Sequence, residues 1–584
     1  MKKDNKQADY LSDKATFREY LGIFRNIRIP WLFIILIFAA SLGTTVAALS
    51  VTYFTGDAVD AQGNVPAAQL VSFALGYLVM AACTAGSSIF SGVASERINL
   101  GLRKALWSRM IYTRQSSYDA DGGESLVSRV TSDCDYASKL LTVFVSFCSV
   151  AVSLVIYVVQ MYALNVQMAN YMLLLIPISL LIGWGYSRLK YLIARKTQAM
   201  LAHTTAYLVE RTGNLSFIKT ANAQDIEVQK GEAYFQEQYW MQIKTGLMTA
   251  FYTALQTLYT IISIVIPFAV GAILVANGVM TAGNVVVFYS ISASVGTYFT
   301  NIIDEVGTLR QANGALARVI RTMKLPIEDV EAGLPLDDPD ADLTFESVQF
   351  RYLQEPVLQN LTCRIPKNRV TAIIGVNGSG KTTMFRLLER LYQPEQGRIL
   401  FGETDAEAYQ LHAWRKAFCT VAQDSPLLTG TIRENICYGC ERPISEDELV
   451  RVAKLVRIYD FVMQLPDGFD TRVSVGGQNF SGGQRQCIAI ARAIMNSPDY
   501  LLLDEATSNL DTRSERQVMD ALEELMKGRT TIIIAHSLSA IRHADHVIVL
   551  NHGRVESSGT PAEILNRTDN YLTTVMNRRQ RGEA

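Results

Sequence analysis

The sequence has 584 residues, enough for about three or four domains at roughly 150 residues each. Hydrophobic residues make up 49% of it and charged residues 19%, and the formal net charge is −1 at pH 7. This balance excludes a disordered chain and gives no sign of a nucleic-acid partner. Long apolar stretches fill the first half, whereas charged residues and glycine concentrate in the second.

Six segments of the first half each hold about 20 mostly apolar residues, the length a helix needs to cross a hydrocarbon layer of about 30 Å. Six such runs could not all be buried in the core of a soluble protein, so the sequence predicts an α-helical membrane domain in contact with lipid. The segments span approximately 31–53, 68–92, 139–163, 168–188, 247–275 and 283–305.

The connections between these segments differ in their content of Lys and Arg. Basic residues are frequent before the first segment and in the long connections 93–138 and 189–246, whereas connection 54–67 has none. The positive-inside rule therefore places both termini and both long connections in the cytoplasm. We expect a multi-pass protein of the plasma membrane, in a bacterial cell. The first apolar run begins too late, and is too long, for a cleavable signal peptide.

Both long connections lack proline and keep helical spacing, so we expect the membrane helices to continue into the cytoplasm. Polar breaks near 116–125 and 213–224 predict the tips of two helical hairpins. Such a tip is suited to docking on another domain. An ordinary solvated loop is the alternative.

A proline-containing linker at 323–342 separates the predicted membrane domain, 31–322, from a second domain at 343–584. There a buried strand, VTAIIGV, leads into GVNGSGKT, and an amphipathic stretch follows. This is the G-x-x-x-x-G-K-[ST] loop in the strand–loop–helix context that phosphate binding requires. Lys381 is expected to reach the β- and γ-phosphates, and the Thr382 hydroxyl to bind Mg²⁺. The predicted nucleotide-binding positions here are Gly375, Asn377, Gly378, Ser379, Gly380, Lys381, Thr382 and Thr383.

Two further stretches complete the predicted nucleotide chemistry. The apolar run YLLL ends in Asp504, whose carboxylate suits Mg²⁺, and in Glu505, which is placed to polarise an attacking water. The run FSGGQRQ opens a helix and offers a second anion site at Ser481, Gly482, Gly483 and Gln484. One nucleotide already has its phosphate loop, so we expect this second site to close over the γ-phosphate bound to another copy of the domain.

The combination of GVNGSGKTT, FSGGQRQ, LLLDEATSNLD and IIIAHS resembles the ATP-binding cassette (ABC) family. With six membrane segments before it, the chain is similar to a half-size ABC exporter of the type IV fold. The resemblance implies an α/β P-loop NTPase cassette fused to the membrane domain, and an elbow helix in the cytoplasmic segment 1–30. It also implies that the tips near 116–125 and 213–224 are coupling helices.

Further roles follow from the resemblance alone. Tyr352 would stack on adenine, and Gln423 would contact Mg²⁺ and the attacking water. His536 would hold the γ-phosphate, and Asp511 would communicate across a dimer of cassettes. The cofactors implied are ATP and Mg²⁺.

The chain departs from the family pattern at several positions. Phe480 replaces the commoner Leu, the D-loop reads SNLD, and Val475 stands where exporters often carry a Glu that contacts the coupling helices. Because Glu505, His536 and the SGGQ run are intact, nothing marks a degenerate half-transporter. A homodimer is favoured, with a heterodimer as the alternative.

The expected function is ATP-driven export of amphipathic small molecules, lipids or peptides. An importer on the same fold and a regulatory or channel-like membrane ATPase are the alternatives. Asp304 and Glu305 would favour cationic cargo if they face a cavity, although a solvated helix end is the simpler interpretation. Tyr289, Tyr298 and Phe299 line an apolar cavity or pack between helices.

Of the eight cysteines, only Cys437 and Cys440 are close in sequence. A CxxC pair is compatible with redox or zinc chemistry, but no second pair is present, so free thiols are expected.

Overall fold

The structure is a computed structural model that describes residues 29–62, 65–121, 123–336, 341–352, 355–422, 424–504, 512–535 and 544–565. The chain divides into two compact units. The first comprises Met1–Ile111 and Gly123–Lys324, and the second comprises Tyr112–Gly122 and Leu325–Ala584.

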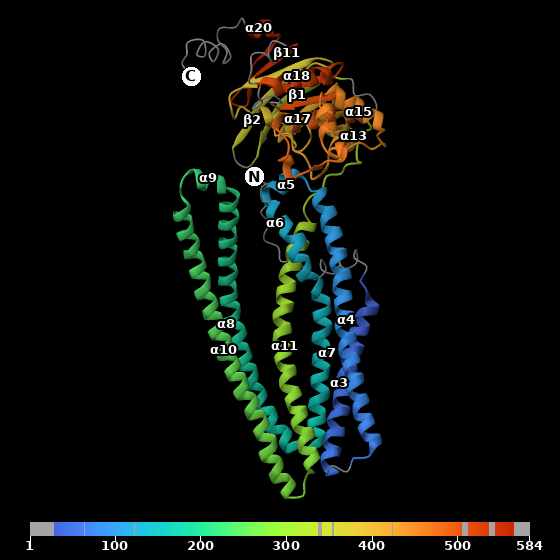
Figure 1. The fold of residues 1–584 in the computed structure, drawn as a ribbon, viewed down its shortest axis with the longest axis vertical. Coiled ribbons are helices and arrows are strands. Elements are labelled where there is room, and N and C mark those ends of the chain that lie inside the picture. The colour runs from blue at the N-terminus through green and yellow to red at the C-terminus, as the bar shows by residue number, and fades with distance from the viewer. Residues whose placement is uncertain are drawn as a thin grey trace. The chain divides into compact units, whose positions relative to one another are not determined.

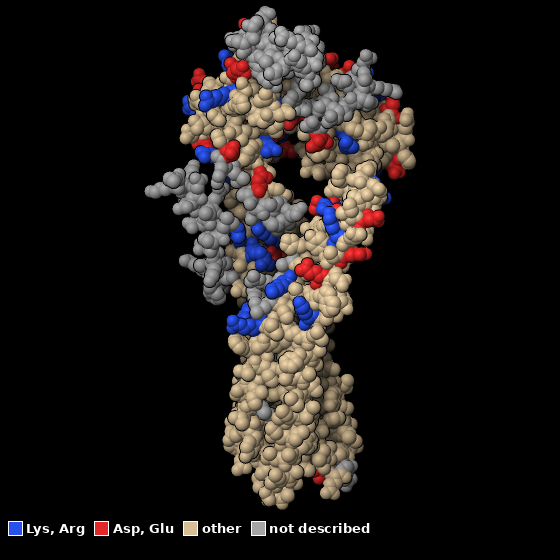
Figure 2. Space-filling view, turned by 90° about the vertical axis from the view of Figure 1, so that its left-hand side faces the viewer, with Lys and Arg blue, Asp and Glu red and all other residues tan. Residues whose placement is uncertain are grey.

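Long helices make up the described part of the first unit (Figure 1). Each of the six predicted membrane segments lies within one of them. They are α3 (Trp31–Asp60), α4 (Ala67–Ile111), α7 (Cys134–Leu164), α8 (Val166–Gly213), α10 (Gln224–Ala276) and α11 (Ala282–Met323). Among the described residues, four helical stretches are long and apolar enough to cross a membrane: Trp31–Asp60, Ala67–Ile111, Leu126–Leu164 and Gln224–Ala276. Figure 2 shows one end of this unit almost free of charged side chains over the visible face.

Several of these helices are much longer than a membrane is thick. The 53 residues of α10 span about 80 Å at 1.5 Å per residue, against about 30 Å of hydrocarbon. Helices α8 and α10 form a long hairpin that turns at the short helix α9 (Leu215–Thr220) (Figure 1). Between α4 and α7 the chain forms α5 (Gln115–Asp121), α6 (Gly123–Ser128) and η1, a π-helix over Arg129–Asp133.

Helix α11 is held against its neighbours by apolar and polar contacts. Phe288 and Ile291 are fully buried in a cluster with residues of α3, α7, α8 and α10. At the other end of α11, Leu316 packs with residues of α4 and α7. There the π-helix is clamped to α11: Arg318 donates two hydrogen bonds, of 2.5 and 2.8 Å, to the carboxylate of Asp133, which is nearly buried.

The second unit contains an antiparallel sheet and a mainly parallel sheet. The antiparallel sheet has the order β2-β1-β4-β5, and the six-stranded sheet has the order β12-β11-β3-β10-β9-β6. In the latter, only β12 runs antiparallel to its neighbour. A short pair, β7 (Gly430–Thr431) and β8 (Arg472–Val473), lies apart from both. The strands are β1 (Leu343–Arg351), β2 (Pro356–Ile365), β3 (Val370–Gly375), β4 (Gln396–Phe401), β5 (Thr404–Asp405), β6 (Phe418–Val421), β9 (Tyr500–Asp504), β10 (Thr530–Ile534), β11 (His546–Asn551) and β12 (Arg554–Gly559).

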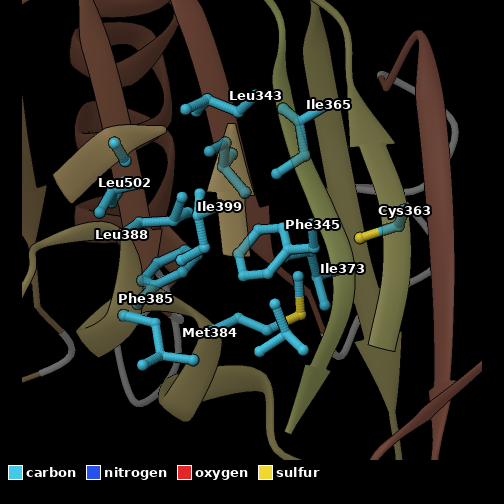
Figure 3. Packing of buried hydrophobic residues seen from close by; sticks show 14 of the residues in the cluster. Leu343, Phe345, Cys363, Ile365, Ile373, Met384, Phe385, Leu388, Ile399 and Leu502 are labelled. Carbon is cyan, nitrogen blue, oxygen red and sulfur yellow. The ribbon is translucent and has the colours of Figure 1, made fainter. Parts of the chain in front are cut away.

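The helices of this unit pack into two main cores. In the first, Met384, Phe385 and Leu388 of α12 lie between the two sheets, against Phe345 of β1 and Leu502 of β9 (Figure 3). The second core holds α14 to α18 together. The helices are α12 (Lys381–Leu388), α13 (Leu411–Ala417), α14 (Ile432–Ile436), α15 (Glu446–Leu455), α16 (Tyr459–Gln464), α17 (Gly482–Asn496), α18 (Thr512–Met526) and α20 (Pro561–Leu565).

Candidate nucleotide-binding site

The phosphate loop connects β3 to α12 through backbone conformations that require glycine. Gly378 and Gly380 have φ values of +81° and +101°, in the left-handed region that side chains disfavour. A Cβ on Gly380 would lie 2.5 Å from Leu358 Cδ2, and one on Gly375 would lie 2.2 Å from the Leu550 carbonyl oxygen. The loop is therefore compact, and it ends at a helix N-terminus, where an anion is favoured.

Polar side chains of this loop fit a polyphosphate. Lys381 is buried, and its ammonium donates to the carbonyl oxygens of Gly375 and Val376, at 3.0 and 3.1 Å. The buried Ser379 hydroxyl has no hydrogen-bond partner among the residues that the structure describes. Asn377, Gly378 and Thr382 are exposed, so the loop is open to solvent on one side.

The mainly parallel sheet brings the ends of four strands to one edge. Ile534 of β10 pairs with Ile373 of β3 on one side and with Asp504 of β9 on the other. Strand β6 adjoins β9, with Val421 opposite Leu503. Because all four strands run parallel, the phosphate loop after β3 and the half-buried Asp504 share the carboxyl edge of the sheet.

Four predicted site residues, Gln423, Glu505, Asp511 and His536, lie outside the described residues. In the chain, Glu505 directly follows β9, while His536 and Gln423 each come two residues after the end of β10 and β6. Their catalytic roles stay predictions.

Tyr352 lies against the helix that follows the phosphate loop. Its hydroxyl is 3.3 Å from that of Thr383 in α12, within hydrogen-bond distance. Arg386 of the same helix donates to the Tyr352 hydroxyl at 3.1 Å and lies over the ring, 5.6 Å from its centroid. The side chain is 39% exposed, which leaves aromatic surface available for a stacked base.

The SGGQ run forms the N-terminus of α17. Ser481 accepts a hydrogen bond from the Gln484 backbone N–H at 3.3 Å, and Gln484 Oε1 accepts one from the Ser481 N–H at 2.8 Å. Ser481 and Gly482 are exposed, whereas Gly483 is buried. The preceding Phe480 is buried and packs edge-to-face on Phe461, so the helical core accommodates Phe at a position where Leu is commoner in the family.

Val475 is an exposed apolar residue, and both thiols of the Cys437–Cys440 pair are free. Val475 is 76% exposed, and it directly precedes Gly476 at φ +65°. All eight cysteines are free, and burial raises the pKa of the Cys437 and Cys440 thiols. Within the described ranges, no cluster of three or more His, Cys, Asp or Glu residues could hold a metal ion.

In the first unit, a cavity of about 170 Å³ lies among α8, α10 and α11. Phe299, one of the predicted aromatics, lines it with Tyr252 and Tyr259. Tyr298 instead packs on Tyr157, and Tyr289 on Phe268.

The side chain of Asp304 is outside the description, but that of Glu305 is placed. Glu305 accepts a hydrogen bond from Ser146 of α7, and its second oxygen is buried without a partner in the described structure. The acid therefore packs between two helices rather than forming a solvated helix end.

Sequence reasoning missed Tyr392 and its contact with Asp119. The Tyr392 hydroxyl donates to the Asp119 carboxylate of α5 within the second unit. The only signal in the sequence was that Asp119 falls in the break expected to be a docking tip.

A phosphate loop on a mainly parallel sheet, joined in one chain to long apolar helices, indicates a membrane protein that binds nucleotide. Family models agree: residues 32–299 match the ABC transporter transmembrane region, and residues 358–508 match the ABC transporter family. The chain belongs to the ABC transporter family, and the predicted fold class is confirmed. It is a multi-pass membrane protein that binds nucleotide and couples ATP hydrolysis to transport.

Several relatives with assigned names match most of the chain. A multidrug resistance ABC transporter ATP-binding and permease protein of Lactococcus lactis is 29% identical over 95% of this chain and 94% of its own length. An ATP-dependent lipid A-core flippase of Cupriavidus pinatubonensis is 31% identical, over 85% and 83%. The human ABC-type oligopeptide transporter ABCB9 is 29% identical, over 92% and 72%.

Proposed function

We propose that this chain is half of an exporter that moves amphipathic molecules out of the cytoplasm, with its cassette and both termini on the cytoplasmic side. The observation that carries the proposal is the meeting of the phosphate loop and Asp504 at one sheet edge of a cassette joined to long membrane helices. The positive-inside distribution of Lys and Arg supports the orientation.

Within the cassette, Lys381 and the loop glycines hold the phosphates, and Tyr352 stacks on the adenine. Thr382, Asp504 and Gln423 would hold Mg²⁺, which when bound neutralises charge on the phosphates. Glu505 accepts a proton from the attacking water, and His536 orients that water toward the γ-phosphate. The shared strand edge supports this arrangement, because all of these residues except Tyr352 lie on it or within eight positions of it in the chain.

Two copies would form the working transporter. The exposed Ser481 and Gly482 begin a 15-residue helix whose N-terminus favours an anion, and the phosphate loop is open on one side. We infer that the SGGQ run of one copy covers the γ-phosphate held by the other, and that Asp511 lies at this junction. The intact catalytic motifs favour identical copies over a heterodimer.

The cavity among α8, α10 and α11, of about 170 Å³, is smaller than a whole drug-sized ligand, so its lining indicates only the chemistry of one part of the cargo. Its lining combines aromatic rings with the hydroxyls of Thr260, Ser263 and Thr297 and the amide of Gln256, and none of the described residues that line it is charged. Such a lining suits uncharged, partly aromatic, hydrogen-bonding molecules better than ions. The names of the relatives, which cover multidrug resistance, lipid A-core and oligopeptides, agree with amphipathic cargo.

The test is ATPase activity in lipid nanodiscs, measured with panels of drugs, lipids and peptides. We expect one amphipathic class to stimulate hydrolysis several-fold, and inside-out vesicles to accumulate that compound when ATP is added. Vesicles that lose the compound on ATP addition would show import. Hydrolysis that no ligand stimulates, with no ligand moved, would favour a regulatory membrane ATPase.

A further inference from the structure

The segment that carries α5 is anchored to the cassette by its backbone. The Arg114 N–H donates to the Pro326 carbonyl at 3.1 Å, and the Glu328 N–H donates to the Tyr112 carbonyl at 2.7 Å. Thr113 and Ile327 form an antiparallel bridge between these bonds. Residues Tyr112–Gly122 accordingly form part of the same compact unit as the cassette.

Glu328, whose backbone pairs with Tyr112, is also connected to α12, the helix that follows the phosphate loop. Arg415 binds both carboxylate oxygens of Glu328, at 2.6 and 2.8 Å. The same guanidinium donates to the backbone carbonyls of Glu389 and Arg390, at the end of α12. A bidentate pair of this kind fixes geometry as well as adding energy. The segment that precedes α5 is thereby connected, through Glu328 and Arg415, to the C-terminal end of α12.

A side-chain contact ties the tip of α5 to the cassette as well. Tyr392 is only 8% exposed, and its hydroxyl donates to one carboxylate oxygen of Asp119. The other oxygen accepts a hydrogen bond from Gln115 Nε2 at 2.9 Å, which orients the carboxylate. Burial and the neighbouring Asp119 raise the pKa of Tyr392, so the hydroxyl keeps its proton and remains a donor.

The ring of Tyr392 packs directly on the candidate adenine-stacking residue. The ring centroids of Tyr392 and Tyr352 are 5.2 Å apart, with the ring planes at 89°. Phe350 completes a three-ring cluster, with its centroid 5.5 Å from that of Tyr392 and 4.9 Å from that of Tyr352. Edge-to-face pairs of this kind are favourable, and packed side chains can pass a displacement to their neighbours. Arg386 and Thr383 hold the other side of Tyr352 to α12.

We propose that Tyr352, Tyr392 and Asp119 form an intrachain relay through which nucleotide bound at the phosphate loop fixes the position of α5. The inference rests on the proposed function, in which Tyr352 stacks on adenine. Tyr392 and Asp119 are positioning residues: they are assigned no contact with the nucleotide, and they act through Tyr352. The hydrogen bond from Tyr392 to Asp119 gives the cassette a polar contact with α5, at the predicted hairpin tip near 116–125. Val475 cannot supply such a contact, because its side chain carries no charge.

The π-helix that follows α5 and α6 in the chain makes two polar contacts with α11. After α5 the chain forms α6 and the π-helix η1, where Arg129 donates to Thr322 Oγ1 at 2.8 Å and Asp133 pairs with Arg318. Both partners lie on α11, the helix that leads into the linker.

The test measures conformational coupling without a cargo. A nitroxide is attached to each protomer at Asn277, in the exposed turn between α10 and α11, through an encoded reactive residue, so that the native cysteines remain. Distances across the dimer are recorded in nanodiscs with and without a non-hydrolysable ATP analogue. Tyr392→Phe removes only the hydroxyl, Asp119→Asn removes only the charge, and Tyr118→Phe on the same helix is the matched control.

We expect the analogue to move most wild-type and Tyr118→Phe pairs to a new distance. A hydrogen bond to a charged group is worth about a tenfold change in an equilibrium constant. Tyr392→Phe and Asp119→Asn should each lower the ratio of shifted to unshifted pairs about tenfold, and the double variant should do no more. Because binding and the conformational shift are linked, the affinity for the analogue should also fall in both variants, by no more than the loss of shift, whereas Tyr118→Phe should keep the wild-type affinity.

Three results would overturn the relay. If wild type shifts and both variants shift equally, the relay is wrong and the proposed function stands. If the variants need more analogue but reach the wild-type ratio of shifted to unshifted pairs once the analogue saturates them, Tyr392 belongs to the nucleotide site and not to a relay. If wild type itself does not shift, the proposed function falls and the relay falls with it.

Discussion

Replacing Glu505 by Gln is expected to lower ATP turnover about 100- to 1,000-fold while leaving ATP binding close to wild type. The amide has the shape of the carboxylate but cannot accept a proton from the attacking water. Asp504, the candidate Mg²⁺ ligand that ends β9, is untouched by the change. Phosphate release in nanodiscs measures turnover, and equilibrium dialysis with ATP measures binding.

Glu523→Gln is the matched control, because this carboxylate lies exposed on α18, outside the proposed site. It should hydrolyse ATP at the wild-type rate. Near-normal turnover in Glu505→Gln would show that Glu505 is not the proton acceptor, and that another group accepts the proton of the attacking water.

Lys381→Ala is expected to abolish ATP binding at concentrations that saturate wild type. Each hydrogen bond from the ammonium to a phosphate is worth about 1.5–3 kcal/mol, so losing two raises the Kd for ATP by about 100-fold or more. In the structure the ammonium also holds the carbonyl oxygens of Gly375 and Val376, so the variant should show a less ordered loop. Binding of a fluorescent ATP analogue checks the affinity.

The control for charge alone is Lys527→Ala, an exposed lysine that pairs with Glu524 on the cassette surface. Its affinity for the analogue should be unchanged. Retained affinity in a folded Lys381→Ala chain, judged by cooperative thermal unfolding without nucleotide, would place the phosphates elsewhere.

The membrane helices could be predicted from the sequence because hydrocarbon offers the backbone no hydrogen-bond partners. Each apolar run of about 20 residues has to satisfy its own N–H and C=O groups, and the helix is the local way to do so. For the same reason Pro177 and Pro267 lie inside α8 and α10 without ending them. The sequence also indicated helical continuation past the membrane and short breaks, at positions where α5 and α9 occur.

The phosphate loop was predictable because its geometry is local. Gly378 and Gly380 have positive φ, a conformation that glycine adopts readily and other residues disfavour. The order of the six-stranded sheet was not predictable, because neighbouring strands such as β3 and β10 are about 160 residues apart in the chain, and pairing at that range depends on the whole fold. The contact between Tyr392 and Asp119 escaped prediction for the same reason, since 273 positions separate the two residues.

The central claim, that ATP is held between the cassettes of two chains, is tested most directly by dividing two defects between subunits. Lys381→Ala disables a phosphate loop, and Ser481→Arg blocks an SGGQ run. Dimers are isolated through two different tags, with Glu505→Gln in every chain, and ATP retained through rapid gel filtration is counted. A dimer with one defect in each chain should retain ATP, because one composite site is intact. A dimer with both defects in a single chain should retain none, because both composite sites are broken. The reverse pattern, with retention only when one chain carries both defects, would show that each cassette works alone and would contradict the account.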